Sequence, residues 1–339
     1  MKVTYTKGVV FMKTNIYALL EKEIMNSDVS EEEKNRQLSK LLNARGQKIN
    51  LMLVGATGSG KSSTINSLFN TSVAKVGVGV DPETKDIECY QMENLTIWDS
   101  PGLGDSIEKD GQYAREIVKK LAETDEEGNP LIDLVVVVID ASSKDMSTTY
   151  ELINNVIIPS LTDENKDRII IAVNQADMAM KGNHWNKEKN CPDETLSEFL
   201  REKCQSVQKR IADATGMEFK VIYYCAGYTD ENGIQNPAYN LTKLLYQIVL
   251  SIPAEKRMAI AENLNDNEEM WQFDDEDEDY VGGISQNFGE TLWDNITDYA
   301  EKGVVYGGAI LGMPGAIVGS LLCGAAGAVM GVFKGLFGK

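Results

Sequence analysis

The chain has 339 residues, enough for one domain with sizeable appendages, and its five cysteines form no CxxC pair, which argues against a disulfide scaffold or a structural zinc site. With 33 Lys+Arg against 52 Asp+Glu the net charge is −19, which argues against a general binder of the nucleic-acid backbone, so no direct DNA binding is expected. The single histidine, His184, excludes a multi-histidine metal site.

The first predicted element is a helical region over residues 15–45. Within it, Ser30 and Glu33 have the spacing of a capping box, in which the serine hydroxyl accepts a hydrogen bond from the backbone N–H three residues later. We therefore expect residues 1–47 to form an N-terminal helical extension.

Short apolar runs then alternate with helical patterns. The strand-like runs are residues 49–54, 95–98, 131–139, 168–173 and 219–224, and the helical patterns are 61–69, 112–121, 149–158, 196–214 and 241–252. Strands that are almost entirely apolar and alternate with helices are typical of a parallel sheet covered on both faces. Residues 86–92 are expected to add an edge hairpin. The sequence therefore predicts an α/β domain over residues 48–257.

A glycine-rich segment lies between the first strand and the first helix of this domain. It matches the pattern G-x4-G-K-[ST] and reads Gly55, Ala56, Thr57, Gly58, Ser59, Gly60, Lys61, Ser62. In such a loop the backbone N–H groups surround phosphates, the lysine reaches the β- and γ-phosphates and the hydroxyl binds Mg²⁺. The segment therefore predicts a nucleotide-triphosphate site.

Two further segments indicate which class of phosphate loop this is. Asp99 ends the second strand and can hold Mg²⁺ through water, and Gly102 can offer its N–H to a γ-phosphate and act as a hinge. In the polar loop before that strand, Thr84 is the best-placed hydroxyl to complete the Mg²⁺ shell, although single threonines are also common in ordinary loops. This arrangement favours a nucleotide switch.

The ends of the last two strands suggest the base that is read. Asp177, in the segment that begins at Asn174, is a carboxylate that can accept two hydrogen bonds from guanine N1 and N2, a donor pair that adenine lacks. Cys225 and Ala226 follow the last strand, and the backbone N–H of Ala226 is expected to meet guanine O6. The sequence therefore predicts GTP and GDP as ligands.

In this order, these elements resemble the GTP-binding domain of P-loop GTPases, and within them the Era/TrmE/septin-like group and bacterial GTPases of the ribosome-binding-GTPase-like kind. The resemblance rests on GATGSGKSSTINSLF, DSPGLGD, VNQAD and YCAG, and covers about residues 48–252. It implies that phosphates and Mg²⁺ contact Lys61, Ser62 and Ser63, that the switches hold Thr84, Asp99 and Gly102, and that guanine contacts Asn174 and Asp177.

Three positions depart from the pattern of this group. Gln175 replaces the lysine that packs over the base. Leu103 stands where Ras-like enzymes carry the glutamine that orients water, so slow intrinsic hydrolysis is expected. Gly58 replaces the asparagine through which some relatives recruit potassium. The resemblance therefore implies that a homodimer through the GTP-binding domain, or another partner, completes the site.

The acidic excess lies mainly in one segment. Between Arg257 and Lys302 there are fourteen acids and no Lys or Arg, and outside it 38 acids stand against 33 bases. Such a run is typical of a solvated linker, so we expect residues 258–302 to be an acidic linker with an amphipathic helix. The apolar positions of that helix are Ile284, Phe288, Leu292, Ile296 and Tyr299. They suit either packing on the domain body or a membrane-surface role.

The last segment, residues 303–339, is glycine-rich and hydrophobic. It holds eleven glycines, many at four-residue spacing, and no charge before Lys334. Residues 315–333 alone are long enough to span a bilayer. Membrane insertion, a soluble pair of glycine-rich helices and an effector-binding tail all remain open for this segment.

The predicted function is a GTP-binding switch with slow, Mg²⁺-dependent hydrolysis of GTP to GDP and phosphate. The predicted location is cytoplasmic, with membrane contact through residues 303–339. Two alternatives remain open: a septin- or dynamin-like structural GTPase that oligomerises on GTP, and a ribosome-associated assembly GTPase. The second is disfavoured by the net charge and by the lack of a basic RNA-binding appendage.

Overall fold

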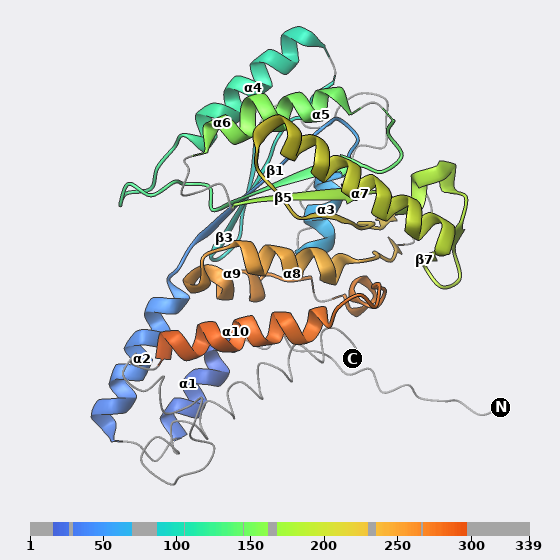
Figure 1. The fold of residues 1–339 in the computed structure, drawn as a ribbon. Coiled ribbons are helices and arrows are strands. Elements are labelled where there is room, and N and C mark those ends of the chain that lie inside the picture. The colour runs from blue at the N-terminus through green and yellow to red at the C-terminus, as the bar shows by residue number, and fades with distance from the viewer. Residues whose placement is uncertain are drawn as a thin grey trace, which may run out of the picture.

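The computed structural model describes residues 16–26, 30–69, 87–104, 106–144, 146–161, 168–229, 235–265 and 267–296 (Figure 1). Thr84 and the tail from residue 297 onward lie outside these residues.

A six-stranded sheet forms the centre of the fold. Its spatial order is β2-β3-β1-β4-β5-β8, and only β2 runs antiparallel to its neighbour β3. The strands are β1 (Ile49–Gly55), β2 (Glu88–Gln91), β3 (Leu95–Asp99), β4 (Leu134–Asp140), β5 (Ile169–Asn174) and β8 (Val221–Tyr223). The predicted mostly parallel sheet and its edge hairpin are therefore confirmed.

Helices cover both faces of the sheet. Alternate side chains of each strand point to opposite faces, and because the strands are almost entirely apolar both faces are buried. In β1, Leu51 and Leu53 belong to one core, and Met52 and Val54 belong to the other. The second core holds α4 (Ile107–Leu121), α5 (Ser147–Glu151), a π-helical turn (Leu152–Ile157), α6 (Ile158–Ser160) and α7 (Glu194–Thr215). Of these, α4, α5 and α6 are seen above the sheet in Figure 1. The first core holds α3 (Lys61–Leu68), α8 (Leu241–Ser251) and α9 (Arg257–Ala261).

Short elements complete the connections. They are η3 (Ala176–Gly182), β6 (Trp185–Asn186), β7 (Cys191–Pro192), β9 (Tyr228–Thr229), β10 (Gln235–Asn236), η4 (Ala254–Lys256) and η5 (Glu268–Trp271). The pairs β6–β7 and β9–β10 each form a two-residue antiparallel ladder next to the main sheet.

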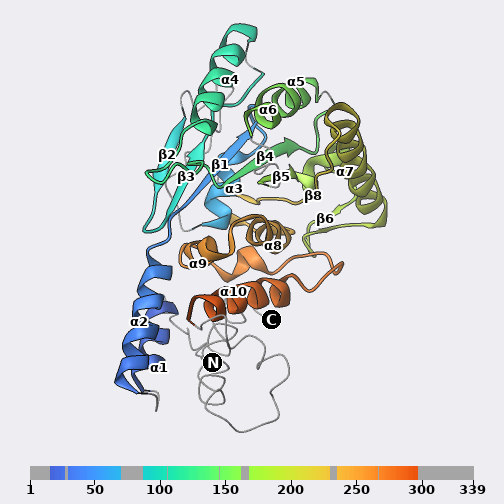
Figure 2. The ribbon, with the colours of Figure 1, turned by 60° about the vertical axis from the view of Figure 1, so that its left-hand side comes forward.

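Two N-terminal helices and the last described helix form a further layer on the α8 side (Figure 2). These are α1 (Ile16–Asn26), α2 (Glu31–Arg45) and α10 (Tyr280–Ile296). Ser30 caps α2, since its hydroxyl accepts from the Glu33 N–H at 3.2 Å. The predicted helical region is thus a pair of helices, and the predicted cap is confirmed.

The acidic segment differs from the expected solvated linker. Met258, Ala259 and Ile260 of α9 are buried in the core that also holds α8, and Trp271 is 1% exposed. Apolar side chains interspersed among the acids anchor the segment to the domain body, and the charge run masks that pattern. The segment continues into α10, which packs on α8 and α2.

The first part of the predicted amphipathic face of α10 packs on the domain body, whereas the side chains of Leu292, Ile296 and Tyr299 lie outside what the structure describes. Ile284 and Phe288 are fully buried in the core with α8. Among the described residues, no helix is both long and apolar enough to cross a membrane.

Candidate functional site

The glycine-rich loop connects β1 to α3 at the carboxyl edge of the parallel strands, where α/β sheets bind ligands. Gly58 and Gly60 have φ of 76° and 89°, values that side chains other than glycine rarely adopt. A Cβ on Gly60 would also collide with the side-chain nitrogen of Asn174. The loop conformation thus depends on glycine both in its backbone and in its packing.

Lys61 lies inside this loop. Its Nζ donates to the backbone oxygens of Gly55 at 3.3 Å and Ala56 at 3.2 Å, and the residue is 7% exposed. The ammonium group is therefore held against the loop, which is where an anion surrounded by the loop N–H groups would meet it.

Ser62 and Asp99 meet beside the loop. The Ser62 hydroxyl donates to Asp99 Oδ2 at 2.6 Å, and Asp99 is fully buried. Burial raises the pKa of the Asp99 carboxyl, against the opposing effects of the Ser62 hydrogen bond and of Lys61. Its second oxygen, Oδ1, is buried and has no hydrogen-bond partner among the described residues. An unsatisfied carboxylate oxygen beside a hydroxyl is a donor set suited to a hard cation.

The segment after β3 lies against the loop. Thr57 N–H donates to Leu103 O at 2.9 Å, and Leu103 N–H donates to Gly55 O at 3.3 Å. Gly102 packs so closely on Thr57 that a Cβ there would collide with the threonine backbone. The predicted hinge residue therefore touches the phosphate loop directly, and Leu103 is buried in the core.

Asn174 and Gln175 tether the phosphate loop to the end of β5. Asn174 Nδ2 donates to Ser59 O at 2.9 Å, and its Oδ1 accepts from the Ala226 N–H at 3.0 Å. Gln175 Nε2 donates to Gly58 O at 2.6 Å. Gln175, which replaces the lysine usual in the group that the sequence resembles, therefore contacts the phosphate loop directly. The sequence did not predict this contact.

Asp177 and Cys225 form the remaining part of the predicted base site. The Cys225 thiol donates to Asp177 Oδ1 at 3.0 Å. Burial raises the pKa of this thiol, and the neighbouring Asp177 raises it further, so the sulfur stays a donor. The Ala226 N–H, expected at guanine O6, is instead used by Asn174 in this structure, because the Asn174 side chain fills the space between the two loops.

The structure brings together all the described residues predicted for the site, from the loop, β3, β5 and the end of β8. Ser59 is fully buried and Ser63 is half-buried at the start of α3. The sequence reasoning missed Thr64, whose hydroxyl bonds Tyr224 Oη at 2.6 Å, and Asn240, which supports β8. An asparagine directly before a helical pattern was the available signal for Asn240.

Residues 50–175 match the family described as 50S ribosome-binding GTPase. This part of the chain is a P-loop GTPase domain. The match includes the phosphate loop, Asp99 and Asn174, and it ends just before Asp177. The sheet order and the two helical layers of the GTPase domain agree with this assignment.

A short stretch of the chain is similar to septins. Septin-8 of Xenopus tropicalis is 40% identical over 72 residues, which are 19% of this chain and 17% of the septin. Human septin-8 is 38% identical over 77 residues, 20% of this chain and 16% of the septin. The chain thus spans about a sixth of the length of the curated relatives it matches.

Solved structures similar to this chain include Toc33 from Arabidopsis thaliana in complex with Mg²⁺ and GMPPNP. It has a TM-score of 0.42 and 15% identity over 72% of this chain and 98% of Toc33. A single-residue variant of Era from Aquifex aeolicus, bound to GDP and AlF4⁻, has a TM-score of 0.38 and 19% identity over 61% of this chain and 58% of Era.

Proposed function

We propose that the chain binds GTP with Mg²⁺, hydrolyses it slowly to GDP and phosphate, and changes conformation between the two states. The observation that carries this proposal is that the phosphate loop and the predicted base site are joined by hydrogen bonds at one edge of the sheet. Asn174 and Gln175 donate hydrogen bonds to the phosphate loop, and Asp177 of the predicted base site follows Gln175 by two residues. A ligand that fills both halves has phosphates at one end and a guanine base at the other.

Mg²⁺ fits the site through Ser62 Oγ and Asp99 Oδ1, the latter being the oxygen without a hydrogen-bond partner among the described residues. When bound, Mg²⁺ supplies positive charge that offsets the charge of the β- and γ-phosphates. Lys61 supplies a second positive charge from inside the loop, and the Asp99 carboxylate holds Ser62 in place through its hydroxyl.

Slow hydrolysis follows from the position of Leu103. This residue is 5% exposed and lies in the core with α4, so it presents no polar group to an attacking water. A homodimer through the GTPase domain, or another partner, would supply the missing water-orienting group.

The switch proposal rests on the contact between the phosphate loop and the segment after β3. Leu103 bonds the loop through both Thr57 N and Gly55 O, and Gly102 packs on Thr57. A γ-phosphate that accepts from the Gly102 N–H competes with these contacts, and loss of that phosphate restores them.

Lys61→Ala tests the nucleotide site. The substitution removes the ammonium group inside the loop, so we expect the dissociation constant for GTP to rise at least about a hundredfold, as for loss of a buried charge-assisted contact. Equilibrium titration with a fluorescent GTP analogue measures this. Lys48→Ala, an exposed lysine before β1, is the control and leaves affinity unchanged. Tight GTP binding by Lys61→Ala would contradict the site.

We also propose that the chain is cytoplasmic and contacts membranes through residues 303–339. The long uncharged, glycine-rich run supports this proposal. Flotation of the full-length protein and of a 1–302 truncation with liposomes tests it: only the full-length protein is expected to float. Equal behaviour of the two proteins would overturn membrane contact.

A further inference from the structure

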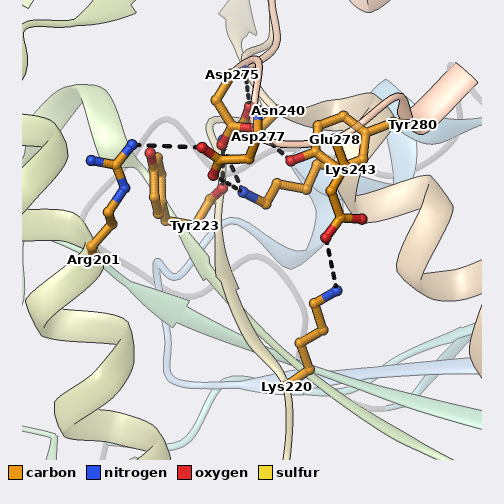
Figure 3. Close-up of polar contacts among 9 residues, drawn as sticks. All are labelled: Arg201, Lys220, Tyr223, Asn240, Lys243, Asp275, Asp277, Glu278 and Tyr280. Carbon is orange, nitrogen blue, oxygen red and sulfur yellow. Dashed lines mark hydrogen bonds and ion pairs between the residues drawn. The ribbon is translucent and has the colours of Figure 1, made fainter.

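In addition to its buried apolar side chains, the acidic segment is fixed to the domain body by the carboxylate of Asp275 (Figure 3). Asp275 Oδ2 accepts from Lys243 Nζ at 2.6 Å and from Asn240 Nδ2 at 2.9 Å, and its Oδ1 accepts from Tyr280 Oη at 2.5 Å. Its side chain is 8% exposed and that of Lys243 is 12% exposed. A buried carboxylate with three donors is held in one geometry, because loss of any donor leaves buried charge less compensated.

Asn240 is bound to the acidic segment at three points. Its side-chain oxygen accepts from the Asp275 N–H at 2.7 Å, its Nδ2 donates to the Asp275 carboxylate, and its backbone N–H donates to Phe273 O at 2.8 Å. Asn240 has φ of 56° and is fully buried. Asn240 tolerates this left-handed conformation, and the surrounding hydrogen bonds fix it there.

Asn240 in turn supports the strand that leads to the base site. Its Nδ2 also donates to Tyr223 O at 3.2 Å. The preceding residue, Tyr239, pairs with Cys225 through two backbone hydrogen bonds of 2.9 Å. Cys225 then donates its thiol hydrogen to Asp177. A continuous set of short contacts therefore connects Asp275 to the carboxylate that reads guanine.

The other ion pairs of the segment involve more exposed acids. Lys243 Nζ also lies 3.2 Å from Asp277 Oδ2, but the Asp277 side chain is 46% exposed. Arg201 lies 3.7 Å from Asp277, and Lys220 lies 3.9 Å from Glu278, and all four side chains are about half exposed. Exposed pairs of this kind stabilise by about 0–1 kcal/mol. The fixed contact is therefore that of Asp275, and the outer acids serve as matched controls for it.

We propose that Asn240 and Asp275 are positioning residues for guanine recognition, which places part of the acidic segment in the support of the nucleotide site. This inference rests on the proposed function. The two residues hold the Tyr223–Ala226 stretch so that the Cys225 thiol keeps Asp177 oriented toward the base. Without the Asp275 carboxylate, Asn240 loses a partner, the stretch loosens and Asp177 is less well aligned.

Base discrimination tests this proposal, because inosine triphosphate lacks the 2-amino group that Asp177 would recognise. In the full-length chain, Asp275→Ala is expected to raise the dissociation constant for GTP about tenfold, the effect of losing one well-aligned hydrogen bond. The constant for inosine triphosphate should rise less, so the preference for GTP falls at least about threefold. Measurements well below the melting temperature keep the protein folded. A purely structural role would lower the melting temperature and leave the preference unchanged.

Two further variants sharpen the test. Tyr280→Phe removes only the hydroxyl that donates to Asp275 and should shift the preference in the same direction by a smaller factor. Glu278→Ala removes one negative charge from an exposed position of the segment and should leave the preference for GTP over inosine triphosphate unchanged. An unaltered preference in Asp275→Ala, or an equal loss in Glu278→Ala, would overturn the inference. A wild-type protein that binds no guanine nucleotide would overturn the proposed function itself.

Discussion

Asp99 illustrates at the scale of one residue how a functional carboxylate lowers stability. The group is fully buried, and one of its oxygens has no hydrogen-bond partner among the described residues. Burial of a charged group without full compensation is unfavourable, which is why its pKa is raised. The ionised Asp99 therefore destabilises the metal-free fold, and a bound cation would compensate its charge.

Asp99→Asn is expected to raise the free energy of unfolding of the metal-free protein by about 1 kcal/mol, because the amide removes the buried charge. Because the pKa of Asp99 is higher in the folded than in the unfolded protein, its ionised carboxylate destabilises the fold. This destabilisation is full above the folded pKa and fades as the pH falls through it. The difference between variant and wild type should shrink in acid. Urea unfolding in EDTA measures both effects.

Asp213→Asn, at an exposed position of α7, provides the control and should leave stability nearly unchanged. The Asp99 variant should at the same time lose the Mg²⁺ dependence of GTP binding. A variant that is less stable than wild type, or that keeps this dependence, would contradict the role given to Asp99.

Much of the candidate site could be predicted from single residues, and the failures have a physical reason. Glycines with positive φ, Lys61 and Ser62 stand in one local pattern, so their spacing alone predicted that they lie together. Asp99 lies 37 residues from Ser62 and was predicted from its own segment at the end of a strand. Asn174 was expected on guanine, yet both ends of its amide bond protein groups. A hydrogen bond to a residue 52 positions away leaves no signal in local spacing.

At the scale of the element, α10 shows how small residues allow close packing. Gly283 faces Tyr246 of α8, and a Cβ built on it would lie 2.5 Å from Cε2 of that ring. Ile284 follows directly and is fully buried. The helix can approach α8 this closely because position 283 carries no side chain.

Gly283→Ala is therefore expected to lower the free energy of unfolding by about 1–3 kcal/mol through overpacking, despite the higher helix propensity of alanine. Gly111→Ala in α4, where the nearest atom would be 3.7 Å away, should instead stabilise by up to about 1 kcal/mol. Denaturant unfolding compares the two variants. Tyr246→Leu in the Gly283→Ala background should recover part of the loss, and a stabilising Gly283→Ala would refute this packing.

Elements that repeat a strong local period were predictable, and the acidic segment was not. The strands β1, β4 and β5 are almost entirely apolar, so their burial followed from composition. Around Trp271, in contrast, single apolar residues stand among acids. Their burial depends on α8 and α9, and no property of the segment alone reveals that neighbourhood.

At the scale of the whole molecule, the GTPase domain and the acidic segment form one body. α10 packs on α8 and also on the N-terminal helix α2. Lys256, before α9, donates to the buried Asp133 at 2.7 Å, and Asp133 Oδ2 accepts from Asn50 N–H at 2.9 Å at the start of β1. Both ends of the described chain thus meet on the side of the sheet that carries α8.

The central claim is that this body reads guanine through Asp177, and the most direct measurement is the binding of GTP and xanthosine triphosphate to Asp177→Asn. Xanthine carries an oxygen where guanine carries its 2-amino group, so an amide at position 177 should favour it. The wild-type chain is expected to prefer GTP, and the variant to prefer xanthosine triphosphate by at least about tenfold. A variant that keeps the wild-type preference for GTP would contradict the account, because the base would then be read elsewhere.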